Sequence, residues 1–369
     1  MSYSKAGHHP DYFLMALVFV LVLFGLVMLS SAGSELGKIR FNDSYYYLKH
    51  QVYNGLIVGL IGFFLAYKIR YQYYKKLALP LLIGTFVLLG LIFTSFGVAS
   101  GGATRWLSFG PVIFQPSEIL KLTFIIYLAA WLSNEKENRK LSFWQGFLPF
   151  LIVVGVMAGL LLKQPSTSMV VILVGAALVV YFASGAKLKY FIGTLLLVAI
   201  GIGAITYFTP YRLERITSFL NKTEDSLGSD YHRNEALIAL GSGGVFGVGY
   251  GESKTKTNYL PAPVDDSIFA VIGEELGFVG AGSLVALFGM LTFRLFWIAR
   301  KLRDKFGQLM LIGFASVIAI QSLINIGAIS GVFPLTGIPL PFISYGGTSL
   351  AIFLTMAGIA LNASKYANK

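Results

Sequence analysis

The feature that most constrains this sequence is a series of long apolar runs that contain no charged residue. Three of them are Tyr12–Ala32, Leu77–Gly97 and Leu309–Ala328. Each reaches the ~20 residues that an α-helix needs to cross the hydrocarbon of a bilayer. A surface helix of a soluble protein would show a charged stripe, and these runs have none. The sequence therefore predicts an all-α, polytopic membrane protein.

Ten predominantly apolar spans can be placed along the 369 residues, and we expect residues 1–369 to form one transmembrane domain. Only 12% of the residues are charged, about half of the roughly 25% typical of soluble domains. The first span exceeds the apolar core of a signal peptide, so we expect an uncleaved helix. The spans are expected near residues 12–32, 51–67, 78–97, 117–133, 144–162, 169–185, 190–208, 276–299, 308–329 and 347–363.

The charged residues, 29 Lys and Arg against 17 Asp and Glu, lie mostly in the loops between these spans. Loops rich in Lys and Arg favour the cytoplasmic side of a membrane. Such loops follow spans two, four, six and eight. We therefore expect both termini to be cytoplasmic, and this topology explains the net charge of +12 without a nucleic-acid partner. The two most basic loops contain Lys68, Arg70, Lys75 and Lys76, and Arg300, Lys301, Arg303 and Lys305.

One outer segment, residues 209–275 between spans seven and eight, is roughly 65 residues long, far longer than most loops. It is rich in apolar and glycine residues, so we do not expect it to be disordered. Loops of this length are usually functional, and the chemistry is therefore expected here, on the outer face. The sequence contains no cysteine, which excludes thiolate catalysis and cysteine metal sites.

A glycine-rich run, Gly241–Gly251, has the spacing of a nucleotide-binding loop but not its setting. Such a loop needs a strand before it and a helix after it within a βαβ unit, and no such unit is visible. We therefore expect tight turns in which backbone approaches other backbone or lipid headgroups.

Four carboxylates follow within residues 265–275, namely Asp265, Asp266, Glu274 and Glu275. An Asp before Ser-Ile-Phe-Ala-Val-Ile would make a good helix N-cap. Alternatively, a carboxylate beside apolar residues at a membrane surface has a raised pKa and suits a general base. Spacing alone leaves both interpretations open.

A second pair, Glu118 and Lys121, is three residues apart on one face of the expected fourth span. Ionisable groups inside a membrane are costly and are usually paired or functional. The pair is therefore either a structural ion pair or part of a substrate cavity.

The outer loop between spans nine and ten, residues 330–346, has no charged residue and is rich in proline and glycine. Irregular backbone at membrane depth must be buried in protein or line a cavity. We expect a re-entrant wall here, with a short surface turn as the alternative.

Four sequence blocks occur in order along the chain. They are Gly102-Ala-Thr-Arg105-Trp106 with Gln115-Pro-Ser-Glu118-x-x-Lys121; Ala239-Leu-Gly-Ser-Gly-Gly-Val-Phe-Gly-Val-Gly; Tyr259-Leu-Pro with Asp266-x-Ile-Phe-Ala-Val-Ile-Gly-Glu-Glu-Leu-Gly; and Asn325-Ile-Gly with Pro334-Leu-Thr-Gly-Ile-Pro-Leu-Pro-Phe-Ile-Ser344-Tyr-Gly-Gly-Thr-Ser. Together these blocks resemble the SEDS family of FtsW and RodA proteins, and the resemblance covers all ten spans. The loop pattern Gly247-Val-Gly-Tyr-Gly-x-Ser253-x-x-Lys256-x-x-Tyr-Leu-Pro is more similar to the FtsW branch.

The resemblance implies a peptidoglycan glycosyltransferase of the bacterial cytoplasmic membrane that polymerises lipid II on the outer face. The family's proposed catalytic Asp, in a Thr-Asp-Phe-Ile-Phe pattern, falls on Asp266. Asp265 stands here in place of the Thr and Ser267 in place of the Phe. The Ile-Phe-Ala sequence that follows favours Asp266, with Asp265 as the alternative.

The leaving group of this reaction is a lipid pyrophosphate, which is stable as an anion and needs cations rather than an acid. The resemblance therefore implies Arg105, Lys121 and Lys256 as pyrophosphate contacts, and it adds Glu118 and Ser344 to the substrate site. A divalent cation, Mg or Mn, would serve the same purpose. No organic cofactor is expected.

The family also implies a partner, a single-span class B penicillin-binding protein that crosslinks the glycan strands. We expect it to contact spans eight and nine, where Gly280, Gly282 and Ser283 allow close helix approach. Two other functions remain open, a flippase for lipid-linked precursors and a non-enzymatic division scaffold. The outer position of the acids disfavours a transporter, whose sites lie near the bilayer midplane.

Overall fold

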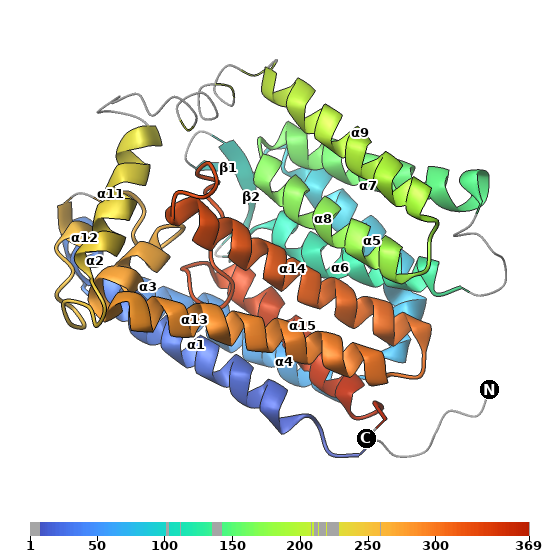
Figure 1. The fold of residues 1–369 in the computed structure, drawn as a ribbon, viewed down its shortest axis with the longest axis horizontal. Coiled ribbons are helices and arrows are strands. Elements are labelled where there is room, and N and C mark those ends of the chain that lie inside the picture. The colour runs from blue at the N-terminus through green and yellow to red at the C-terminus, as the bar shows by residue number, and fades with distance from the viewer. Residues whose placement is uncertain are drawn as a thin grey trace.

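The computed structural model describes residues 8–100, 103–110, 112–134, 142–207, 209, 213, 219, 229–258 and 260–368. It confirms the all-α class. Long helices form a bundle, and short helices gather at one end of it (Figure 1). The helices are α1 Tyr12–Ala32, α2 Ser34–Phe41, α3 Tyr46–Gln51, α4 Val58–Lys68, α5 Gln72–Leu91, α6 Pro116–Leu132, α7 Leu148–Lys163, α8 Thr167–Ala183, α9 Leu188–Tyr207, α11 Ser229–Ser242, α12 Thr255–Asn258, α13 Ile268–Lys301, α14 Lys305–Ile329 and α15 Gly347–Ser364, with π-helical turns at Val52–Ile57 and Phe143–Phe147.

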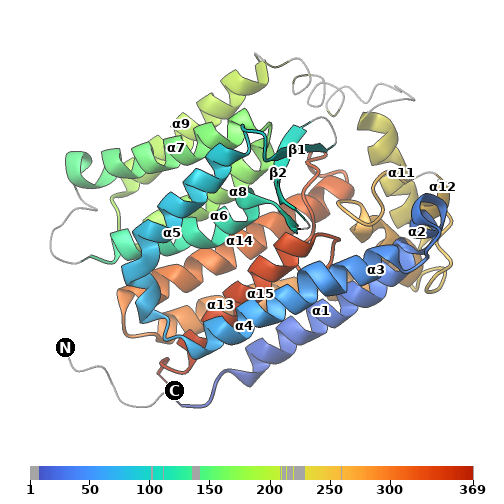
Figure 2. The same cartoon turned by 180° about the vertical axis from the view of Figure 1, so that it is seen from behind.

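Among the described residues, seven helical segments are long and apolar enough to cross a membrane. Of the other three predicted spans, two correspond to the shorter helices α6 and α8, and the third corresponds to α9. The two ends of the described chain lie next to each other. The amide of His8 donates a hydrogen bond to the carbonyl oxygen of Lys365, and Figure 2 shows the end of the chain beside the start of α1. An even number of crossings is therefore required. The count of ten agrees with this and stays a prediction.

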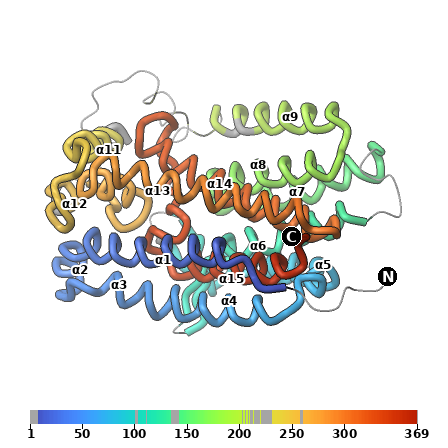
Figure 3. The backbone as a smooth tube through the Cα atoms, turned by 60° about the horizontal axis from the view of Figure 1, so that its bottom comes forward, coloured from blue at the N-terminus to red at the C-terminus, as the bar shows by residue number. Residues whose placement is uncertain are grey.

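The helices α14 and α15 form the centre of the bundle. In their most apolar windows 67% and 72% of the residues are buried, against 22% in α5. The first packs on α6, α8 and α13, and the second packs along α4. Figure 3 shows α9 on the outside beyond α8, and α2, α3, α11 and α12 together at the end opposite the C-terminus. This end is where the predicted outer segments meet.

The predicted third span, residues 78–97, is wrong at both ends. The helix α5 begins at Gln72 and ends at Leu91, where the hydroxyl of Thr94 donates to the Leu91 carbonyl oxygen over 2.6 Å. The chain then enters a small antiparallel sheet of order β1-β2-β3, formed by Gly97–Ser100, Ala103–Phe109 and Val112–Phe114. The sequence analysis did not predict this sheet.

The predicted eighth span, residues 276–299, starts too late because α13 begins at Ile268 and contains a break at Gly277. The glycine run joins the two halves of this helix. Amides of Val248 and Gly249 donate to the carbonyl oxygens of Glu274 and Glu275 over 3.0 and 3.1 Å. The amides of Phe278 and Val279 donate in turn to the carbonyl oxygens of Gly244 and Val245. Backbone groups freed by the break are thus satisfied, as a membrane bundle requires.

The expectation of close backbone approach in the glycine run is therefore confirmed. Gly277 has a φ of +66°, and a Cβ added there would lie 2.3 Å from the amide nitrogen of Gly247. A side chain at this position would meet both an unfavourable backbone conformation and a backbone clash.

We predict that Gly277→Ala lowers the free energy of unfolding by about 1–3 kcal/mol. Gly282→Ala is the matched control, because it lies in the same helix and no atom lies within 4 Å of the position of its added Cβ. The thermal unfolding midpoint of the purified protein in detergent measures the difference. Equal midpoints for the two variants would show that the break does not require glycine.

Candidate active site

The two predicted acids lie at the start of α13. The N-cap of this helix is Ser267, and its side chain makes no capping hydrogen bond. Neither Asp265 nor Asp266 therefore holds the N-cap position, so the helix-cap interpretation is wrong.

Asp266 is half-buried and lies against the segment between α14 and α15. Its carboxylate Oδ2 lies 3.8 Å from the position that a Cβ on Gly337 would occupy. Its backbone carbonyl oxygen accepts a hydrogen bond of 2.8 Å from the side-chain amide of Asn325 on α14. The backbone of the acid is thus fixed by a helix of the bundle centre.

The uncharged segment, residues 330–346, has irregular backbone. Its second part is buried at residues 338 and 340–344, as the re-entrant interpretation predicts, whereas Val332 and Phe333 in its first part are exposed. Side chains of other elements and the carbonyl oxygen of Val264 make hydrogen bonds to its backbone. The side chain of Ser168 donates a hydrogen bond of 2.9 Å to the carbonyl oxygen of Thr336. Those of Asn325 and Gln321 donate to the carbonyl oxygens of Ile338 and Pro339 over 2.7 and 2.8 Å. Further along, the side chain of Gln51 donates to the Ser344 carbonyl oxygen over 3.2 Å. The backbone amide of Tyr345 donates to the carbonyl oxygen of Val264 over 2.8 Å. These bonds satisfy backbone groups that water cannot reach.

The predicted pair on α6 is a buried ion pair. The ammonium of Lys121 lies 2.7 Å from the Glu118 carboxylate and donates to the side-chain oxygen of Gln321 over 2.8 Å. Gln321 lies one helical turn below Asn325 on α14, and both amides bind the re-entrant segment. The pair is therefore connected through α14 to the backbone beside Asp266.

Arg105 on β2 is half-exposed and binds the turn between α7 and α8. Its guanidinium donates to the carbonyl oxygens of Gln164 and Pro165 over 3.2 and 2.7 Å. The same turn leads to Ser168, which binds the re-entrant segment at Thr336. Arg105 thus approaches the site from the side of the small sheet.

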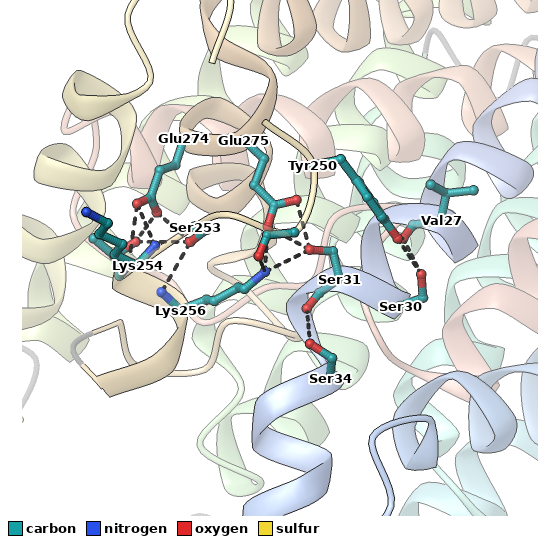
Figure 4. Close-up of polar contacts among 12 residues, drawn as sticks. Val27, Ser30, Ser31, Ser34, Tyr250, Ser253, Lys254, Lys256, Glu274 and Glu275 are labelled. Carbon is teal, nitrogen blue, oxygen red and sulfur yellow. Dashed lines mark hydrogen bonds and ion pairs between the residues drawn. The ribbon is translucent and has the colours of Figure 1, made fainter. Parts of the chain in front are cut away.

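The remaining predicted residues, Lys256 and Ser344, are buried and bonded to protein. The ammonium of Lys256 lies 2.7 Å from the Glu275 carboxylate (Figure 4). The hydroxyl of Ser344 accepts a hydrogen bond of 2.8 Å from the amide of Leu340. The structure thus connects Asp266 to the α6 pair through α14. The predicted roles of all these residues towards a substrate stay predictions.

Gln321 and His232 contribute to the site although the sequence analysis did not single them out, and Asn325 was named there only as part of a sequence block. The two amides are polar residues in an otherwise apolar span, and this signal was available in the sequence. His232 on α11 is different, because its Nε2 lies 2.5 Å from the hydroxyl of Ser267, 35 positions further along the chain. No local pattern could have revealed that contact.

Asp265 is accessible to water, yet protein surrounds it closely. Burial and the charge of Asp266 raise the pKa of the Asp265 carboxyl to about 7, and the guanidinium of Arg40 on α2 acts in the opposite direction. The Asp265 carboxyl thus interacts with Arg40 of α2 and with Tyr345 of the re-entrant segment, while Asp266 lies beside Gly337 of the same segment. The two acids repel one another, because the charge of Asp266 disfavours the ionised form of Asp265.

The described residues do not supply a complete protein site for a metal. Within them, no three or more His, Cys, Asp or Glu side chains come together. The Mg or Mn prediction therefore gains no ligand set from the part of the chain that is described, and we derive no step through a metal.

With this geometry in place, residues 12–369 match the family of cell cycle proteins that comprises FtsW, RodA and SpoVE. The chain belongs to this family. Stage V sporulation protein E of Bacillus subtilis is 38% identical to it over 359 residues, which cover 97% of each chain. Probable peptidoglycan glycosyltransferase FtsW of Geobacter sp. strain M18 is 37% identical over 96% of each chain. The resemblance that the sequence blocks indicated is confirmed.

Solved structures of the family share the fold. A chain of a peptidoglycan synthase complex that coordinates polymerization and crosslinking superposes with a TM-score of 0.80, at 28% identity, over 97% of this chain and 99% of that one. The rod shape determining protein RodA of Thermus thermophilus superposes with a TM-score of 0.72 at 28% identity, over 98% of each chain. Family membership thus extends over the whole bundle, which confirms a multi-pass membrane protein.

We predict that Asp265→Asn raises the thermal unfolding midpoint at pH 8, by about 1–3 °C, and leaves it nearly unchanged at pH 4. The pKa of Asp265 is raised from 3.8 to about 7 in the folded protein. Between these pH values the Asp265 carboxyl is protonated in the folded protein and ionised in the unfolded chain. This contribution to stability is present below about pH 4 and is lost as the pH rises through about 7.

A matched control is Asp43→Asn, because a hydrogen bond from Lys49 lowers the pKa of Asp43. That substitution should not raise the midpoint at pH 8. If Asp265→Asn shifts the midpoint equally at both pH values, the shift does not arise from ionisation of Asp265.

Proposed function

We propose that this protein is a peptidoglycan glycosyltransferase that polymerises lipid II at the outer face of the bacterial cytoplasmic membrane, with Asp266 as general base. The observation that carries the proposal is the position of Asp266. Its backbone is bound by Asn325, and its carboxylate lies at the re-entrant segment beside a second acid. The glycosyltransferase names of several relatives support the same activity.

In the proposed reaction, Asp266 removes the proton from the 4-hydroxyl of the acceptor N-acetylglucosamine. The oxygen then attacks C1 of N-acetylmuramic acid, and the bond from C1 to the lipid pyrophosphate breaks. Because this leaving group departs as an anion, a single base suffices, whereas a glycosidase needs a pair of carboxylates. A second carboxylate near Asp266 is therefore not required as an acid.

Among the proposed substrate contacts, Arg105 is the most accessible, since its side chain is half-exposed. A guanidinium matches the geometry of phosphate oxygens and is suited to bind the pyrophosphate. The other four proposed contacts, Glu118, Lys121, Lys256 and Ser344, are buried. They would need rearrangement of the site to touch a substrate.

The proposed partner is a single-span class B penicillin-binding protein. Support comes from the fold shared with a chain of a complex that coordinates polymerization and crosslinking. The outer part of α13 offers an apolar face, where Phe278 and Val279 are exposed and no atom lies within 4 Å of an added Cβ on Gly282. At Gly280 the added Cβ would lie 2.2 Å from Leu276 of the same helix, so this glycine serves the helix break instead.

We predict that Asp266→Asn lowers polymerisation of purified lipid II by at least about 100-fold while membrane insertion is retained. The asparagine keeps the size of the side chain and removes the base. Glycan products are resolved on gels, and Glu35→Gln, an exposed carboxylate on α2, is the control that should retain normal activity.

Normal polymerisation by Asp266→Asn would exclude Asp266 as the base. Absence of polymer from the unmodified protein under all conditions would instead favour a flippase or a scaffold.

We also propose that the termini are cytoplasmic and that the glycine run faces outward. Since the chain has no cysteine, Glu252→Cys would introduce one exposed thiol next to this run. A membrane-impermeant maleimide should label it in intact spheroplasts, to the same extent as after lysis. Labelling that requires lysis would reverse the topology.

A further inference from the structure

The segment that follows the glycine run is fixed to α13 by a cluster of buried polar groups (Figure 4). The carboxylate of Glu274 accepts hydrogen bonds from the hydroxyls of Ser253 and Thr255 and from the amides of Lys254 and Thr255. This places residues 253–255 directly on the first half of α13. The sequence analysis left Glu274 as one of four carboxylates with an open role.

The neighbouring carboxylate, Glu275, connects three elements. It accepts hydrogen bonds of 2.6 and 2.8 Å from the hydroxyl of Ser31 on α1 and pairs with the ammonium of Lys256 over 2.7 Å. The exposed fractions of Glu275, Ser31 and Lys256 are 0%, 4% and 6%. This is therefore a buried ion pair with a hydroxyl partner.

The ammonium of Lys256 has three protons, and each has an acceptor. These acceptors are the Glu275 carboxylate at 2.7 Å, the Ser31 hydroxyl at 2.9 Å and the Gly251 carbonyl oxygen at 2.8 Å. A lysine ammonium can donate no more than three hydrogen bonds. No donor of Lys256 is left for a pyrophosphate in this arrangement.

Asp266 directly precedes the N-cap of the first half of α13, and Glu275 lies near the other end of that half. Beyond Glu275 the helix breaks at Gly277, so its first half is a separate short helical segment. Fixing Glu275 to α1 therefore fixes the end of this segment that lies opposite Asp266. A second contact in the same place supports this, because the hydroxyl of Tyr250 donates to the Val27 carbonyl oxygen on α1 over 3.0 Å.

We infer that Lys256 is a positioning residue that acts through Glu275 and Ser31 to orient Asp266, and that it does not bind the pyrophosphate of the substrate. The inference rests on the proposed function for the identity of the reaction, but the positioning itself is a property of the fold. It assigns Ser31, Lys256 and Glu275 to one unit.

The decisive comparison uses Lys256→Met, Glu275→Gln and the double variant. Either single change leaves one buried charge without its counter-charge, whereas the double change removes both charges and keeps the shapes. We expect each single variant to lower kcat for lipid II polymerisation by at least about tenfold with KM nearly unchanged, and the double variant to recover to within about threefold of the unmodified protein. Lys254→Met, an exposed lysine in the same segment, should have little effect.

If Lys256 binds the pyrophosphate, the double variant cannot recover, because the ammonium is still missing. KM would then rise in both Lys256→Met and the double variant. That result would overturn the inference.

A second measurement does not depend on polymerisation. Ser253→Cys introduces the sole thiol of the chain at a position with 4% exposure. Its labelling by a maleimide in detergent should be slow, should accelerate when either Lys256→Met or Glu275→Gln is added, and should be slow again with both. Unchanged labelling in the single-charge variants would overturn the inference. The expected labelling pattern in a protein that forms no polymer would instead leave the positioning intact and refute the proposed function.

Discussion

Backbone polar groups inside an apolar bundle must find partners within the protein, and the arrangement of the candidate site follows from that constraint. The chain departs from helix at two places near the candidate site, the break at Gly277 and the segment 330–346. The glycine run supplies the partners at the first place through its backbone. The side-chain amides of Gln321 and Asn325 on α14 supply the hydrogen-bond partners at the second place. Asp266 lies between the two, so both sets of bonds determine its position.

Two buried ion pairs support these departures from helix. Lys121 pairs with Glu118 and binds Gln321, which in turn holds the re-entrant segment. Lys256 pairs with Glu275 and binds Ser31 of α1, which holds the first half of α13. Each pair includes a neutral hydrogen-bonding side chain from another helix. Burying a lone charge is costly, so loss of either charged partner would destabilise the arrangement. Each ion pair therefore fixes the relative positions of the helices that it joins.

The spans could be predicted from the sequence because long uncharged runs have one stable environment, a membrane. Their ends could not, since α5 stops where Thr94 bonds the backbone and α13 extends across a break. The position of Asp266 followed from a sequence block. Its surroundings did not, because Ser31 meets Glu275 across 244 positions and Lys121 meets Gln321 across 200. Burial of Lys256 was equally hidden, since a lysine in a loop is usually solvated.

The placement of the two acids shows how a loop residue can be held as firmly as one in a helix. Asp265 is oriented towards Arg40 and the outer helices, and its charge is disfavoured by Asp266. The backbone of Asp266 is bound by Asn325 of the central helix α14. Ser267 next to it meets His232 of α11. Three consecutive residues thus contact three different parts of the fold. The segment before α13 can therefore present Asp266 in one orientation, because elements anchored in the bundle supply its support.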